Sequence, residues 1–274
     1  MSANSFEKVL SVFVFALTSF LCILYASADT MFGQGLNVVC KSLTLSHGRF
    51  WGLSVLLLMG TSTLMLFLGR MAYIARHTRR WIAPIKENVI EVEHTVIREF
   101  QARRIIDVDV IHSDQILACS YGLVKPRILI TMGQISLLSR DELLAILEHE
   151  YRHCRNRDPL RVLFAYSVRW ALFFIPMIKV WTERFFLEKE IEADQAAITN
   201  VGLRPLAVSL YKSLTIVQND GSLPLALSLN ELVSHRIDFL TQGTIHRNPI
   251  SVSTLVVSLV SIMILVVVLI LCFM

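Results

Sequence analysis

Three uncharged apolar blocks dominate the sequence, at residues 9–28, 50–68 and 252–273. A helix rises about 1.5 Å per residue, so roughly 20 apolar residues cross the ~30 Å hydrocarbon core of a bilayer. Only 18% of the 274 residues are charged, and the formal net charge is +4. The chain is therefore predicted to be an integral membrane protein with three transmembrane helices in contact with the lipid bilayer. A disordered chain and a nucleic-acid partner are excluded.

The first block admits a second interpretation, a cleaved signal peptide. Ala26-Ser27-Ala28 fits the small-residue pattern of a cleavage site, and Lys8 precedes the block as a thin positive region. The apolar core of a signal peptide is usually about 7 to 15 residues long, and this block is longer. A retained transmembrane helix is favoured, and the signal peptide stays open as the alternative.

Basic residues predict which side of the membrane the chain faces. They follow the second block as Arg70, Arg76, Arg79 and Arg80, and they precede the third block as Arg247. Cytoplasmic loops carry the excess of Lys and Arg, so both flanks are assigned to the cytoplasm. The N-terminus is then inside, and the loop at 29–49 and the C-terminus are outside.

This topology divides the chain into three parts. Residues 1–75 form two transmembrane helices with a short outer loop, residues 76–249 form a cytoplasmic domain, and residues 250–274 form the third transmembrane helix. The C-terminal helix carries no charged residue in its apolar block.

The middle segment mixes helical and strand patterns, which predicts a mainly helical α+β domain. Residues 86–104 have helical periodicity, whereas apolar residues at 106–110 alternate with aspartates, as in a half-buried strand. A turn then leads into a short apolar strand at 127–131. Ser139 and Glu142 have the S-x-x-E spacing of a capping box, so a helix is predicted to begin at Ser139.

That helix carries an HExxH motif at residues 149–153. His149 and His153 are four residues apart and lie on one helix face, where two neutral imidazoles can bind one zinc ion. Glu150 is placed to act on a zinc-bound water without being a ligand. Two histidines on a packed helix can also be purely structural, so a third ligand is needed to strengthen the interpretation.

A second acidic cluster supplies candidates for that ligand. Glu190 and Asp194 share a helix face at i, i+4, which suits one carboxylate that binds the metal and one that orients a ligating histidine. Glu192 points about 200° away from Glu190 and is expected in solvent. The alternative is an ordinary charged helix face.

A fourth apolar stretch, 162–181, contains two charged residues and Pro176. Charges within a span cost a few kcal/mol each, which favours an amphipathic or buried helix ending near Pro176. If this stretch crossed the membrane once, Glu190 and His149 would lie on opposite sides and could not bind one ion. The stretch therefore crosses zero times or re-enters on the same face, which returns Glu190 to the HExxH helix near the cytoplasmic leaflet.

The HExxH motif followed by Glu-x-x-Ala-Asp at 190–194, in a domain flanked by membrane helices, resembles the integral-membrane gluzincins. The resemblance is closest to the BlaR/MecR-type peptidases, metallopeptidase family 56. Their G-x-x-x-P-x-I segment is similar to 122–128, and the sequence after their zinc helix is similar to 157–160. The related HtpX and CAAX prenyl protease types share the zinc motifs and are the second choice.

This resemblance implies a gluzincin-like zinc peptidase domain. It implies His149, His153 and Glu190 as Zn²⁺ ligands, Glu150 as the catalytic residue, and Asp194 as the carboxylate that orients a ligand. It also implies a location in the bacterial inner (plasma) membrane, with the peptidase domain in the cytoplasm.

A further histidine is a weaker candidate for catalysis. His235 could stabilise a tetrahedral oxyanion, with a surface role as the alternative, and the neighbouring Arg236 resembles an arginine found in that region of these families.

The expected function is that of a membrane-bound zinc endopeptidase that cleaves a protein or peptide at the cytoplasmic membrane face, in regulatory proteolysis under a sensor partner. The strand at 127–131 is expected to be a sheet edge on which an extended substrate could pair. The alternative function is a non-catalytic zinc-binding membrane regulator or signal transducer. The intact Glu150 argues against that alternative.

Overall fold

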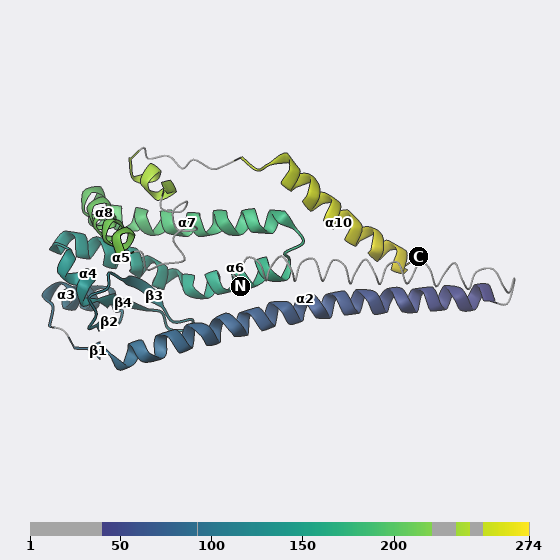
Figure 1. Ribbon diagram of the computed structural model, residues 1–274, viewed down its shortest axis with the longest axis horizontal. Coiled ribbons are helices and arrows are strands. Elements are labelled where there is room, and N and C mark those ends of the chain that lie inside the picture. The colour runs from purple at the N-terminus through teal and green to yellow at the C-terminus, as the bar shows by residue number, and fades with distance from the viewer. Residues whose placement is uncertain (1–39, 92, 221–233, 242–248, 274) are drawn as a thin grey trace. The chain divides into compact units, whose positions relative to one another are not determined.

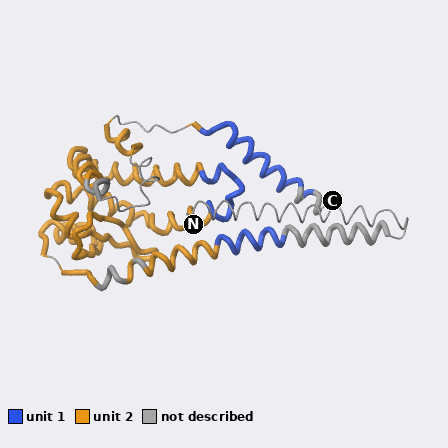
Figure 2. The backbone as a smooth tube through the Cα atoms, in the orientation of Figure 1, with its two compact units in different colours: residues 1–67, 169–179, 250–274 blue, residues 68–168, 180–249 orange. Residues whose placement is uncertain are grey.

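The computed structural model describes residues 40–91, 93–220, 234–241 and 249–273 (Figure 1). The first apolar block, 9–28, lies outside the described residues. The chain divides into two compact units (Figure 2). Unit 1 comprises 1–67, 169–179 and 250–274, and unit 2 comprises 68–168 and 180–249.

The second apolar block lies within the long helix α2 (Cys40–Glu87), and the third coincides with α10 (Val252–Phe273). Within α2, the segment Leu57–Arg80 is 24 residues long, apolar enough to cross a membrane, and not buried by protein. In α10 the apolar stretch found is the shorter Val252–Val267. The described residues thus contain one membrane-capable helix, and the three-helix arrangement remains a prediction.

Unit 2 contains a sheet of four short strands in the order β1-β2-β4-β3. The strands are β1 (Val89–Ile90), β2 (Val108–Ile111), β3 (Ala118–Tyr121) and β4 (Arg127–Thr131). Strands β2 and β4 are parallel, while β1 and β3 pair antiparallel to β2 and β4 respectively. The predicted strand at 127–131 is confirmed, but the prediction that it forms an edge is wrong, because β4 has a neighbour on each side.

Helices cover both faces of this sheet. On one face, α3 (Thr95–Arg104) and α5 (Arg140–Asn156) pack on β2 and β4 around Phe100, which is fully buried. On the other face, Ile82 of α2 packs on β2, β3 and β4. The sheet is therefore a buried layer that supports α5, the helix with the HExxH motif.

The same packing corrects two expectations. All four residues of β2 are buried, so the strand is not half-buried, and Asp109 is tolerated inside because it accepts a hydrogen bond from the Tyr121 hydroxyl. The predicted helix at 86–104 is wrong in its first half, since α2 ends at Glu87 and α3 begins only at Thr95. Between these helices, β1 pairs with β2, and this long-range pairing overrides the local helical periodicity.

Four further helices lie wholly or mostly in unit 2. They are α4 (Met132–Leu137), α6 (Asp158–Ala171), α7 (Pro176–Asn200) and α8 (Leu203–Asp220), and residues 234–241 are also helical. The helix expected to end near Pro176 ends at Ala171 instead. Pro176 begins α7, a position where its missing N–H costs nothing.

Helices α6 and α7 run side by side as a hairpin, with the rings of Tyr166 and Phe186 4.6 Å apart (Figure 1). The turn of this hairpin belongs to unit 1, where the backbone N–H of Met177 donates to Ser258 Oγ of α10 at 3.0 Å. The returning helix α7 carries the second acidic cluster of the sequence.

Candidate metal centre

Helix α5, which carries the HExxH motif, has a well-defined N-terminus. The predicted capping box is confirmed, with Ser139 at the N-cap and its backbone N–H donating to Glu142 at 3.0 Å. His149, Glu150 and His153 are all buried, about halfway along and near the end of α5.

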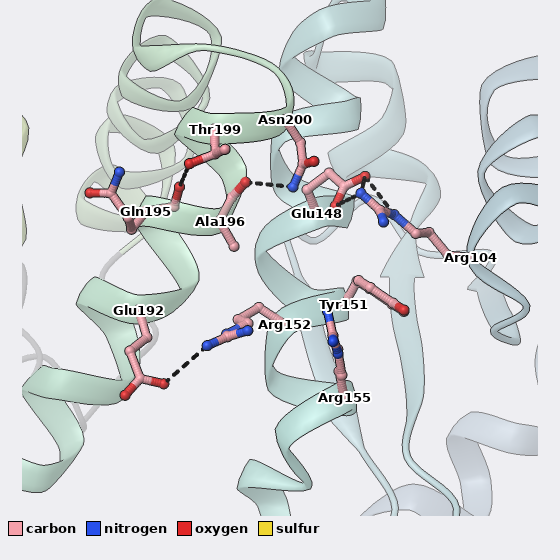
Figure 3. A pocket seen from close by; sticks show the side chains of 10 residues that line it. All are labelled: Arg104, Glu148, Tyr151, Arg152, Arg155, Glu192, Gln195, Ala196, Thr199 and Asn200. Carbon is pink, nitrogen blue, oxygen red and sulfur yellow. Dashed lines mark hydrogen bonds and ion pairs between the residues drawn. The ribbon is translucent and has the colours of Figure 1, made fainter.

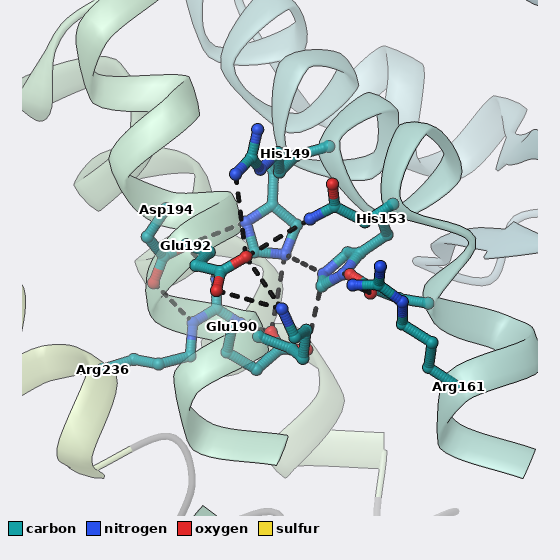
Figure 4. Close-up of polar contacts among 11 residues, drawn as sticks. His149, His153, Arg161, Glu190, Glu192, Asp194 and Arg236 are labelled. Carbon is teal, nitrogen blue, oxygen red and sulfur yellow. Dashed lines mark hydrogen bonds and ion pairs between the residues drawn. The ribbon is translucent and has the colours of Figure 1, made fainter. Parts of the chain in front are cut away.

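The two imidazoles and Glu190 of α7 form a compact triangle of donor atoms (Figure 4). His149 Nε2 lies 3.2 Å from His153 Nε2. The Glu190 carboxylate approaches each of these nitrogens to 3.5 Å. The structure therefore brings together His149, His153 and Glu190, as the sequence predicted, and these are the described residues that could hold a metal ion.

This triangle fits Zn²⁺. Two ligands about 2.0–2.1 Å from a tetrahedral zinc ion are about 3.3 Å apart, which is close to the three separations just given. Each histidine also has its Nδ1 atom at a carboxylate, which favours a proton on Nδ1 and leaves a lone pair on Nε2. Two lone pairs that face each other in a buried site repel, and a cation between them removes that repulsion. Two nitrogen donors and one oxygen donor match the ligand set of catalytic zinc sites.

The Nδ1 atom of each imidazole, on the opposite side of the ring from the proposed metal, contacts a different carboxylate. Asp194 Oδ1 lies 2.9 Å from His149 Nδ1, and Asp158 Oδ2 lies 3.0 Å from His153 Nδ1. Both aspartates are buried. Such contacts orient a ligating imidazole and increase its basicity.

The sequence motifs predicted a role for Asp194 but none for Asp158. Arg157 ends α5 in a left-handed conformation, with φ of 54° and its N–H bonded back to the helix. This tight reversal starts α6 at once and returns Asp158 to His153. The resemblance of 157–160 to the family gave Asp158 no role, and a left-handed turn at an arginine leaves no sequence signal that would place this acid against His153.

Arg236 is the second residue whose place the sequence analysis did not anticipate. Its guanidinium donates to both oxygens of Asp194, at 2.8 and 2.6 Å, and lies 3.1 Å from Glu190 (Figure 4). Burial disfavours the charge, but these two carboxylates raise the pKa of Arg236 above its usual value. Arg236 therefore fixes the two acidic side chains of α7 relative to each other.

The predicted oxyanion residue lies beside this arginine rather than in the cluster. His235 is half-buried, and its Nδ1 has no hydrogen-bond partner among the described residues. Its catalytic role remains a prediction that the described contacts do not support.

The electrostatics of the cluster favour positive charge between the ligand atoms. Burial and the Arg236 charge disfavour protonation of His149, but contacts with Asp194 and Glu190 outweigh them and raise its pKa to about 9. Burial opposes ionisation of Glu190 and Asp194 as well, yet the contacts with His149 and Arg236 lower both pKa values. The site thus holds two carboxylates ionised and attracts either a proton or a metal cation.

Glu150 of α5 is buried, and its charge acts on two nearby thiols. Burial, and then the negative charge of Glu150, raise the pKa of Cys119 on β3 to about 12. The pKa of Cys154 is raised for the same two leading reasons, and this thiol packs in the core. Both thiols are therefore protonated, structural groups at neutral pH.

The fold and the site together define a class: a peptidase-like domain with a buried His-His-Glu cluster, attached to a membrane-capable helix. Residues 46–205 match the family model described as BlaR1 peptidase M56. The chain belongs to this peptidase family.

One relative extends the comparison to a whole protein. The chain is 25% identical over 119 residues to "Regulatory protein BlaR1" of Bacillus licheniformis. This alignment covers 42% of the chain and 20% of the relative, so the chain spans about a fifth of that protein's length. The similarity agrees with membership of the same peptidase family.

Proposed function

We propose that the chain is a membrane-bound, zinc-dependent endopeptidase that cleaves a protein or peptide at the cytoplasmic face of the bacterial inner membrane, in regulatory proteolysis. The observation that carries the proposal is the triangle of His149, His153 and Glu190, in which both imidazoles are buried and Glu150 lies between the two histidines on the same helix. Membership of a peptidase family supports it independently.

His149, His153 and Glu190 would hold the zinc ion, and Asp194 and Asp158 would orient the two imidazoles. Zinc supplies Lewis acidity, which acidifies a water molecule and polarises a carbonyl group. Glu150 takes a proton from the water and returns it to the leaving nitrogen of the peptide. Arg236 holds Asp194 and Glu190 in place during this reaction.

Strand β3 is the edge on which we place the substrate. Its only described neighbour in the sheet is β4, and Cys119 in its middle lies within the electrostatic influence of Glu150. An extended peptide can add to such an edge through main-chain hydrogen bonds. This assignment replaces the strand at 127–131, whose two edges are already paired.

The membrane arrangement belongs to the same proposal. Three transmembrane helices, within 1–75 and 250–274, would anchor a gluzincin-type domain at 76–249 on the cytoplasmic side. The membrane-capable segment Leu57–Arg80 supports one of these helices, and the basic residues that end it support the orientation. A sensor partner is expected to control the activity.

The test compares wild type with Glu150→Gln, each purified full-length and loaded with zinc. Gln keeps the size of Glu but cannot accept the proton, so cleavage should fall by about 10²- to 10⁴-fold while about one zinc per chain is retained. Glu183→Gln, which removes a carboxylate outside the cluster, is the matched control and should cleave normally.

Substrates can be found as proteins that accumulate in cells carrying Glu150→Gln. Equal cleavage by wild type and Glu150→Gln would remove Glu150 from the mechanism. A zinc-loaded wild type that cleaves no cellular protein would instead favour the non-catalytic zinc regulator.

A further inference from the structure

A cavity of about 270 Å³ lies beside α5, lined by the residues labelled in Figure 3. Arg155, which lines it, is about 120° around the helix axis from His149. The other walls come from α3 and α7, and no residue of the His-His-Glu triangle lines the cavity. The cavity is therefore separate from the proposed zinc site.

One wall of the cavity is a rigid, neutral ion pair. Arg104 donates three hydrogen bonds of 2.8–2.9 Å to Glu148, whose side chain is only 3% exposed. The same guanidinium lies 5.1 Å from the ring centroid of Tyr151. Both carboxylate oxygens of Glu148 thus bind Arg104, and the charge of Glu148 is already neutralised.

The remaining charges leave a positive excess. Glu192 lies 2.9 Å from Lys189 but 3.7 Å from Arg152, so Lys189 is its principal partner. Arg152 Nε is buried and has no hydrogen-bond partner in the part of the chain that the structure describes. Arg155 likewise forms no ion pair with any described residue. Counted with Lys189, four cationic side chains at this cavity face only the two carboxylates of Glu148 and Glu192, which leaves a positive excess.

We propose that this cavity binds a phosphate group. A phosphate monoester carries a charge of about −1.5 to −2 at neutral pH, which matches this positive excess better than the single charge of a carboxylate does. The planar fork of an arginine donates two parallel hydrogen bonds to phosphate oxygens. The side chains of Gln195 and Thr199 add polar groups to the same cavity.

The proposal is tested with inorganic phosphate and full-length protein in zwitterionic nanodiscs, by calorimetric titration at constant ionic strength. Replacing Arg155 or Arg152 by Gln should weaken phosphate binding by about 10- to 100-fold, since a hydrogen bond to a charged group contributes about 1.5–3 kcal/mol. Arg140→Gln removes the same charge from α5 outside the cavity, where its side chain is 62% exposed, and should bind like wild type.

A second measurement distinguishes a soluble phosphorylated ligand from a lipid headgroup. If the phosphate comes from lipid, nanodiscs that contain phosphatidic acid, whose headgroup is a phosphate monoester, should weaken binding of added phosphate to wild type. If it comes from a soluble molecule, lipid composition should have no such effect. Thermal unfolding of each variant shows whether it is folded, and Arg155→Lys, which keeps the charge without the fork, should bind with intermediate affinity. No binding by folded wild type, or equal binding by all variants, would overturn the proposal, whatever the outcome of the peptidase test.

Discussion

The two histidines of the cluster are held by aspartates that differ in what else they bind. Asp194 is completely buried and accepts two hydrogen bonds from Arg236. Asp158 is also buried, but its other cationic neighbour, Arg161, is 3.8 Å away and half-exposed. Loss of the Asp194 charge therefore affects both an imidazole and a buried guanidinium, whereas loss of the Asp158 charge affects chiefly an imidazole.

This difference predicts two separable mutant phenotypes. Asp158→Asn and Asp194→Asn should each weaken zinc retention by about 10- to 100-fold, because an amide orients the imidazole less well and makes it less basic. Only Asp194→Asn should also lower the unfolding temperature markedly, because it leaves the buried charge of Arg236 poorly compensated. Competition for zinc by a chelator and thermal unfolding measure the two effects.

Asp141→Asn is the control for both aspartates, since Asp141 is exposed in the first turn of α5. Zinc retention by Asp158→Asn equal to that of Asp141→Asn would show that Asp158 does not support the metal ligand.

At the scale of elements, local sequence patterns predicted the helices that carry the site. The arrangement of the sheet depends instead on long-range strand pairing. The capping box located the start of α5, and the membrane-side argument correctly returned Glu190 to His149. Strand β1 was missed because it pairs with β2 some 20 residues along the chain, which helical periodicity does not encode. The central place of β4 likewise depends on the parallel pairing with β2.

The turn between α5 and α6 explains why Asp158 could not be predicted. A left-handed residue at a helix end is usually Gly or Asn, and here it is Arg157. Pro159 signals a helix boundary nearby, but with Arg in place of Gly or Asn at 157 the sequence does not show how tightly the chain reverses there. The position of Asp158 against His153 therefore becomes visible only with the backbone.

The same turn yields a prediction about stability. Arg157 pays a conformational cost of about 1 kcal/mol in the left-handed region, which glycine avoids. Arg157→Gly should therefore raise the unfolding temperature of the zinc-loaded protein by a few degrees. Arg157→Ala keeps the Cβ atom that causes the strain and should give no gain. Thermal unfolding in one detergent compares the three proteins, and a lower unfolding temperature for Arg157→Gly would show that other contacts of Arg157 outweigh the strain.

For the molecule as a whole, the question is which parts of the chain face the cytoplasm. The zinc ligands come from α5 and α7, on either side of the apolar stretch 162–181. Their approach within 3.5 Å requires both helices on the same side of the membrane. In the proposed topology this side is the cytoplasm, because arginines end the membrane-capable segment.

A labelling experiment in intact cells tests this orientation. Val124 is 78% exposed in the turn before β4, so Val124→Cys offers an accessible thiol on the peptidase domain. Asn37→Cys places a thiol in the loop predicted to be outside. A membrane-impermeant maleimide should label Asn37→Cys in intact cells and Val124→Cys only after permeabilisation. Wild type controls for the native cysteines, of which Cys154 is buried. Labelling of Val124→Cys but not Asn37→Cys in intact cells would invert the topology and place the proposed zinc site outside the cytoplasm.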